Sequence, residues 1–104
     1  MKISRTPRIK ITRNGVPGEY IWSGATWFFA SERPPLNIKP RGLWEMGRSC
    51  KIVTELDKED LVRILTAFGL SRKWWEDQEY HLDQVKMTSP ERLEYFAEQA
   101  SRAA

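Results

Sequence analysis

The clearest structural signals in this chain lie in residues 49–83, SCKIVTELDKEDLVRILTAFGLSRKWWEDQEYHLD. The middle of the stretch has apolar residues at the i, i+3, i+4 and i+7 spacing of one helix face. These residues are Leu61, Ile64, Leu65 and Phe68. Asp57 is a favourable N-cap, and Gly69 can adopt the left-handed conformation that ends a helix. We therefore expect a packed helix over residues 57–68, with a buried strand before it over residues 51–54.

Two tryptophans follow this helix. Ser71 is placed to cap a further helical turn that carries Trp74 and Trp75. Neighbouring helix positions lie about 100° apart, so we expect one indole to be buried and the other to be only partly buried. An exposed tryptophan would be the best single candidate for a contact hot spot. A last helix is expected from Thr88-Ser89-Pro90-Glu91, because a Thr/Ser cap, a first-turn proline and an early glutamate coincide there.

Several short motifs occur together in this part of the chain. They are Trp44, Ser49-Cys50, Lys51–Thr54, Asp57–Phe68, Gly69-Leu70, Arg72, Trp74-Trp75 and Tyr80-His81-Leu82-Asp83. With these motifs the chain resembles a small family catalogued as domain of unknown function 4031, which is common in phage and bacterial genomes. The resemblance implies a phage setting and carries no activity with it.

The first half of the chain predicts a three-strand meander. Arg8–Arg13 alternates between apolar and polar residues, as a half-buried strand does. The following stretch holds two turn signals, Asn14-Gly15 and Pro17-Gly18, after which Glu19–Ser23 has the composition of a second strand. Gly24-Ala25 fits a two-residue loop leading into a third strand over Thr26–Ala30.

The third strand carries three consecutive aromatic residues, Trp27, Phe28 and Phe29. Because side chains alternate along a strand, these three cannot all face one side. The strand is therefore covered on both faces or exposes an aromatic ring to a partner, and core packing is the favoured interpretation. Residues 31–47 contain three prolines and two glycines without helical periodicity, which predicts an extended, partly polyproline-like crossover.

These elements predict a single α+β domain over residues 1–104. The part over residues 1–48 would be basic and rich in β-strand, and would end in the proline-rich crossover. The part over residues 49–104 would add one strand and the helices. We expect a small, mostly antiparallel sheet, formed as a meander by the N-terminal half and packed by two C-terminal α-helices.

The composition favours a folded protein of a reducing compartment. Hydrophobic residues make up 40% of the chain, and Cys50 is the only cysteine, so no intramolecular disulfide can form. No apolar run follows the basic N-terminus, and no segment approaches the roughly 18 apolar residues of a membrane span. We expect a cytoplasmic location, in the host cytoplasm if the chain is phage-encoded, and no membrane partner. Cys50 is expected to be buried in its strand and unreactive.

Charge is divided unevenly along the chain. Residues 1–50 hold nine basic and three acidic residues, a net charge of +6, whereas residues 51–104 have a net charge of −3. The first thirteen residues hold five of the cations and no acid. Such a segment suits the phosphate backbone of a nucleic acid or an acidic protein surface. The alternative is a solvated strand face whose cations protect a sheet edge from aggregation.

The candidate contact residues combine these cations with aromatic residues. They are Lys2, Arg5, Arg8, Lys10, Arg13, Trp22, Arg41 and Trp75. The favoured function is non-enzymatic binding of nucleic acid, or of an acidic or nucleoprotein partner, by a small phage-type protein. Inhibition of host machinery, including a defence system, is one hypothesis of this class. No cofactor is expected, because the chain has no glycine-rich phosphate loop, no H-E-x-x-H motif and no cysteine pair.

Two other functions remain open. Acidic residues surround the only histidine, and in an extended segment Glu79, His81 and Asp83 would share one face. They could then hold Mg²⁺ or Mn²⁺, or act as general acid and base, in a metal-dependent hydrolase or nuclease. A solvated acidic surface is the alternative for the same residues. The third hypothesis is a protein-interaction or oligomerisation module that acts through the aromatic strand.

Overall fold

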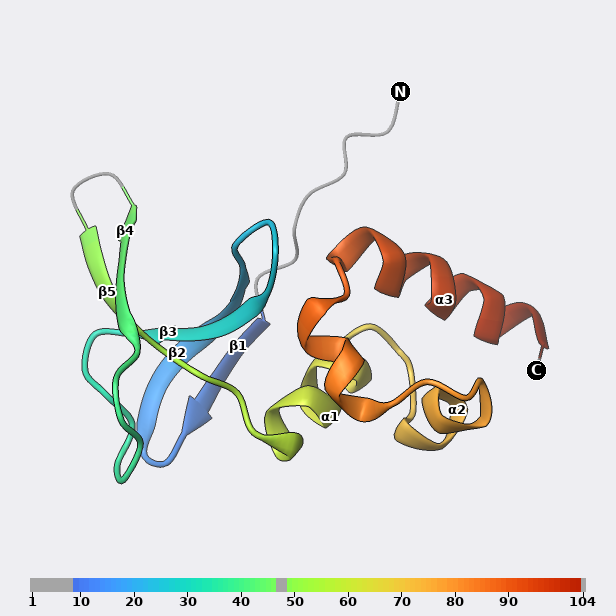
Figure 1. Ribbon diagram of the computed structural model, residues 1–104, viewed down its shortest axis with the longest axis horizontal. Helices are drawn as coiled ribbons and strands as arrows, with labels where there is room; N and C mark the ends of the chain where they lie inside the picture. Colours follow the sequence, from blue (N-terminus) through green and yellow to red (C-terminus); the bar gives the residue numbers. More distant parts are fainter. Residues whose placement is uncertain (1–8, 47–48, 104) are drawn as a thin grey trace.

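The computed structural model describes residues 9–46 and 49–103 and shows a five-stranded sheet followed by helices (Figure 1). The strands are β1 (Ile9–Arg13), β2 (Val16–Trp22), β3 (Trp27–Ser31), β4 (Gly42–Met46) and β5 (Ser49–Thr54). The helices are α1 (Lys58–Ala67), α2 (Arg72–Asp77), the 3₁₀ helix η1 (Leu82–Met87) and α3 (Pro90–Ala103). The sheet order is β1-β2-β3-β5-β4, and every neighbouring pair is antiparallel. The predicted α+β class is confirmed.

Tight turns set the register of the meander. Asn14 and Gly15 have φ angles of 47° and 80°, as a type I′ hairpin turn requires, and Arg13 pairs with Val16 across it. The second turn places Gly24 at a φ of 99° and is closed by the Ser23 N–H, which donates to the Thr26 carbonyl. Both predicted hairpins are present, but the second strand begins at Val16 and not at Glu19, so the predicted turn at Pro17-Gly18 is wrong: both residues pair with β1.

The segment predicted to be only a crossover contains a strand. Gly42–Met46 forms β4 and pairs with β5 along its whole length, at the edge of the sheet. The prolines at 34, 35 and 40 all precede it, so they do not interrupt its hydrogen bonds. The strand depends on a partner later in the chain, which is why local composition did not predict it. β5 in turn pairs with β3, so the β4–β5 hairpin extends the meander instead of covering it.

The helix boundaries follow the predicted caps. The Asp57 side chain accepts a hydrogen bond from the Asp60 N–H at the start of α1, and Gly69 has a φ of 82° after its end. Ser71 caps α2 by accepting a hydrogen bond from the Trp74 N–H. Trp75 is buried and Trp74 is half-buried, as expected from their adjacent positions. No helix in residues 9–46 and 49–103 is long and apolar enough to cross a membrane.

The core lies between the helices and one face of the sheet. Figure 1 shows the helices on one side of the β1–β2–β3 part, while the β4–β5 hairpin stands away from them. Trp27 is fully buried, and its indole N–H donates to the Thr88 carbonyl at 2.7 Å. Trp75 donates in the same way to the His81 carbonyl at 3.0 Å. Trp27 and Phe29 are both core residues, so the aromatic strand does not offer these two rings to a partner.

Candidate functional site

The register of the sheet divides its side chains between two faces. Tyr20, Phe29 and Thr54 are successive cross-strand partners, and all three are fully buried against the helices. We call this side the inner face. The next row of cross-strand partners points the opposite way, because side chains alternate along each strand. That row, Lys10, Glu19, Ala30 and Val53, belongs to what we call the outer face.

Arg13 lies on the inner face and is only 5% exposed. Its guanidinium lies 2.7 Å from Asp60 Oδ2 and donates to the Thr54 hydroxyl at 3.0 Å. The same group sits over the Phe29 ring, 5.5 Å from its centroid. This placement corrects the sequence prediction, because a buried and fully paired arginine cannot contact a nucleic acid or a protein partner.

The carboxylate of Asp60 is the centre of this buried network. Tyr20 donates to its Oδ1 at 2.6 Å, Arg63 lies 3.2 Å from the same oxygen, and the Asp57 N–H donates to Oδ2. Burial raises the pKa of Asp60, while the hydrogen bond from Tyr20 and the charge of Arg13 act in the opposite direction. Burial also raises the pKa of the Tyr20 hydroxyl, and its bond to Asp60 raises it further. The network joins β1 and β2 to α1, so its role is structural.

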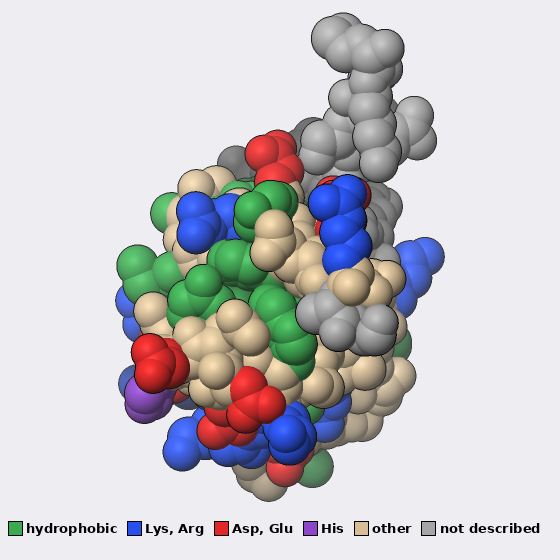
Figure 2. All heavy atoms as spheres, turned by 90° about the vertical axis from the view of Figure 1, so that its right-hand side faces the viewer, with side chains coloured by type: hydrophobic (Ala, Val, Ile, Leu, Met, Phe, Trp, Pro, Cys, Tyr) green, Lys and Arg blue, Asp and Glu red, His purple; other side chains and the backbone are tan. Residues whose placement is uncertain are grey.

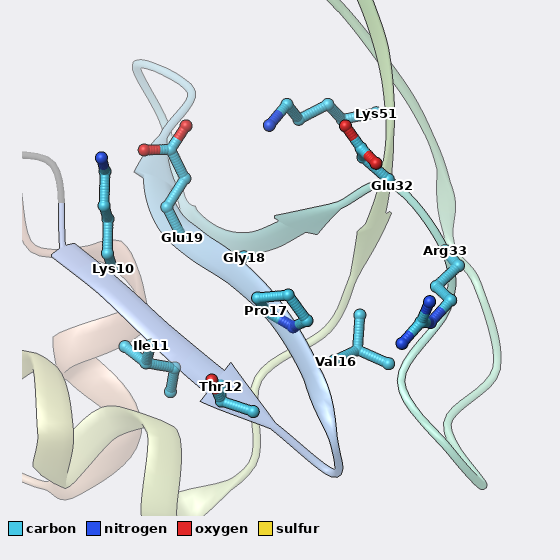
Figure 3. Close-up of a pocket in the computed structure, with 10 residues that line it drawn as sticks. All are labelled: Lys10, Ile11, Thr12, Val16, Pro17, Gly18, Glu19, Glu32, Arg33 and Lys51. Carbon is cyan, nitrogen blue, oxygen red and sulfur yellow. The ribbon is translucent and has the colours of Figure 1, made fainter.

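The outer face contains a cavity of about 620 Å³ (Figure 3). We call it the outer cavity, and its lining residues are Lys10, Ile11, Thr12, Val16, Pro17, Gly18, Glu19, Glu32, Arg33 and Lys51. Three segments far apart in the sequence bring cations to it: Lys10 from β1, Arg33 from the loop after β3, and Lys51 from β5. Its volume lies within the roughly 300–1,000 Å³ typical of ligand pockets.

Glu19 lines the outer cavity between two of its lysines. Its side chain rises from β2 between Lys10 and Lys51, with the carboxylate directed into the open space (Figure 3). The residue is only 8% exposed, and its carboxylate forms no hydrogen bond or ion pair with any residue in the described part of the chain. Glu19 therefore differs from Glu32, which is exposed at the rim.

The other predicted contact residues are not gathered at the outer cavity. Lys2, Arg5 and Arg8 lie outside the described residues. Arg41 is exposed, but its guanidinium lies 2.6 Å from the Glu55 carboxylate. Trp22 is half-buried and packs against Trp27, with their ring centroids 5.7 Å apart. Trp75, at 1% exposure, is a core residue, which corrects its prediction as a contact residue.

Sequence reasoning did not select Arg33, Lys51 or Glu19. Lys51 shares the outer face with Lys10 only because β5 enters the sheet beside β3. Glu19 lies directly across from Lys10 once the Asn14-Gly15 turn fixes the register of β1 and β2. That second pairing was available from the hairpin rules, since a two-residue turn between residues 13 and 16 determines every later pair.

The acidic segment around His81 forms a second cavity, of about 370 Å³. The backbone turns into η1 directly after His81, so the segment is not extended. Glu79, His81 and Asp83 nevertheless all line this cavity, together with Lys58 and Arg72. His81 Nδ1 accepts a hydrogen bond from the Asp83 N–H and caps η1. In residues 9–46 and 49–103, no three His, Cys, Asp or Glu side chains come close enough together to hold a metal ion. The geometry of the described residues therefore does not support the predicted metal site at Glu79, His81 and Asp83.

Apolar surface is found at the end of the molecule formed by α2 and α3. Figure 2 shows hydrophobic side chains gathered there, bordered by charged groups. Tyr95 is 58% exposed, and Trp74 and Ala97 are half-buried. Exposed apolar surface is therefore present here, whereas Trp27 and Phe29 of β3 are buried. Cys50 is exposed on β5, contrary to the expectation that its strand would bury it.

Comparisons of the chain with protein-family models, with curated proteins and with solved structures find no match. Membership of the family catalogued as domain of unknown function 4031 therefore stays a prediction.

Proposed function

We propose that the protein binds single-stranded nucleic acid without catalysis, and that the outer cavity is the contact site. The observation that carries the proposal is the convergence of Lys10, Arg33 and Lys51, from three separate segments, on one hollow of the sheet. Cations that neutralise phosphates release condensed counterions, which is the main source of affinity for nucleic acids.

The shape of the site favours a single strand over a duplex. The cations surround a cavity on a sheet face, with Lys10 and Lys51 on either side of Glu19 (Figure 3). Proteins that bind single strands use a positively charged groove that tracks the backbone of the strand. Duplex readers instead present a helix or a β-ribbon to a groove, whereas the three cations here surround a hollow on a sheet face. The biological setting, including inhibition of a host defence system, rests on the family resemblance alone.

Salt dependence tests this function. Binding of fluorescein-labelled single-stranded RNA and DNA oligonucleotides would be measured by anisotropy across a series of salt concentrations. For the Lys10→Ala, Lys51→Ala double variant we expect weaker binding to all sequences and a log–log salt slope smaller by about 1.4, from about 0.7 per lost phosphate contact. The matched control is Lys73→Ala, which removes one exposed cation from α2 on the other side of the molecule. The proposal is wrong if no oligonucleotide binds, or if the control variant loses as much affinity as the double variant.

A further inference from the structure

We propose that Glu19 recognises a guanine base held in the outer cavity, while Lys10 and Lys51 contact the phosphates on either side of it. This inference rests on the proposed function, because it assumes that the ligand is a nucleic acid. It adds the base that the site prefers and the residue that selects it.

The carboxylate of Glu19 is available to a ligand. Its carboxylate points into the cavity (Figure 3), at 8% residue exposure and with no donor from the described residues. By contrast, Asp60 on the inner face receives two groups at each carboxylate oxygen. A ligand that brings donors to Glu19 would gain bonds that the protein itself does not supply. Glu19 can therefore select a ligand that donates hydrogen bonds to its carboxylate.

The chemistry of a carboxylate selects among the four bases. An ionised carboxylate only accepts hydrogen bonds, and its two oxygens match two adjacent donors. The Watson–Crick edge of guanine presents the N1–H and the N2 amino group side by side. Adenine, cytosine and uracil each place an acceptor next to their donor on that edge, and this acceptor would face a carboxylate oxygen. Guanine is thus the base that Glu19 accepts without repulsion.

The charges around Glu19 disfavour a basic peptide in the same place. An arginine side chain could form a bidentate pair with Glu19, but it would have to enter between Lys10, Arg33 and Lys51. Glu32 is the only other acid that lines the cavity. The site needs a hydrogen-bond donor for Glu19 and an anion for the surrounding cations. A nucleotide supplies both, because its base is a neutral donor and its phosphate is an anion.

Oligonucleotides that differ at one base test the inference. The probes are uridine nonamers with a central guanosine, adenosine, cytidine, uridine or inosine, measured against the full chain at constant salt. We expect the guanosine probe to bind roughly 5- to 150-fold more tightly than the adenosine, cytidine and uridine probes, the range for one bidentate base contact. Inosine lacks the N2 amino group, so its affinity should lie between that of guanosine and that of the others.

Two glutamine variants separate recognition from charge. Glu19→Gln replaces one carboxylate oxygen by an amino group, so the preference for guanosine should disappear while the salt slope of binding is retained. Glu32→Gln, the matched control, removes the same charge at the rim of the same cavity and should keep the preference. Circular dichroism and a thermal melt would test whether both variants fold.

Each further outcome has a definite meaning. Equal affinity for all five probes, or a guanosine preference that persists in Glu19→Gln, overturns the inference but leaves the proposed function standing. Absence of binding to every probe refutes the proposed function itself. If an arginine-rich nonapeptide binds instead, and Glu19→Gln abolishes that binding, the ligand is a basic peptide and the guanine assignment is wrong.

Discussion

Arg13 and Lys10 lie three residues apart on the same strand, yet they belong to opposite faces of the sheet. Arg13 is enclosed by Asp60, Thr54 and Phe29 and links the sheet to α1. Lys10 is exposed and lines the outer cavity, where Glu19 is its cross-strand neighbour. The comparison teaches that the strand face of a cation decides its role, whereas the net charge of a segment does not. The cations on one face of a basic strand can stabilise the fold, while those on the other face remain available for a ligand.

Removal of the Asp60 carboxylate should cause the largest loss of stability of the changes considered. Asp60→Ala would leave Arg13 as a buried charge without its partner, and we expect a loss of about 3–5 kcal/mol in the free energy of unfolding. Urea denaturation followed by tryptophan fluorescence would measure it. The matched control is Arg41→Ala, which breaks an exposed pair with Glu55 and should cost less than about 1 kcal/mol. Similar losses in the two variants would show that the inner network is not the stabilising one.

The backbone of β2 offers a second test of inner-face packing. A Cβ atom added at Gly18 would lie 2.4 Å from the Ala30 carbonyl oxygen and 2.6 Å from Phe29 Cζ. We therefore expect Gly18→Ala to destabilise the protein by about 1–3 kcal/mol, the usual cost of overpacking. Gly42→Ala is the control, because its added Cβ would meet only Val53 Cγ2, at 3.9 Å. A neutral Gly18→Ala variant, measured by the same denaturation, would contradict the observed closeness of Phe29.

The hydroxyl of Tyr20 should make the stability of the inner face sensitive to high pH. Burial raises its pKa above the unfolded value near 10, so the unfolded chain loses this proton first as the pH rises. The stabilisation is complete below pH 10 and declines as the pH rises towards the pKa of the folded state. The wild type should therefore lose stability relative to Tyr20→Phe above pH 10. Denaturation midpoints of both proteins between pH 8 and 11.5 would measure this, and parallel curves would contradict it.

The smallest effect on folding is expected on the outer face. Lys10→Ala and Lys51→Ala break no ion pair within the described residues, so each should change the free energy of unfolding by less than about 0.5 kcal/mol. The same thermal melts used to validate the binding variants would measure this. A large loss of stability in either variant would mean that the outer cations brace the sheet, and the contrast between the two faces would fail.

Local signals predicted the elements of the fold, and long-range pairing supplied what they missed. Asp57 and Gly69 marked both ends of α1, and Asn14-Gly15 marked the first hairpin. β4 could not be predicted, because Gly42–Met46 has little strand character without β5 beside it. The apolar stripe of α1 predicted which of its faces is buried. The sheet face on which each cation lies could be assigned only once the strand register was known.

The candidate site was harder to predict than the fold. Of the predicted contact residues, Lys10 alone among the described ones lines the outer cavity. The prediction that Arg13 contacts a ligand was wrong because its ion-pair partner, Asp60, lies in the other half of the chain. Asp60 is held in place as part of the capping box at the start of α1. Glu19 could not be assigned to the site from the charge of its segment, because its place beside Lys10 in the outer cavity depends on the register of β1 and β2.

The network around Asp60 makes the two halves of the chain depend on each other for folding. Its hydrogen bonds join residues 40 positions apart in the sequence, across the boundary between the basic and the acidic half. A gene fragment encoding the meander alone would leave Arg13 without an acid and could not be exchanged as a self-contained building block. Two separately expressed halves should instead need each other, and would recover the fold as a non-covalent pair.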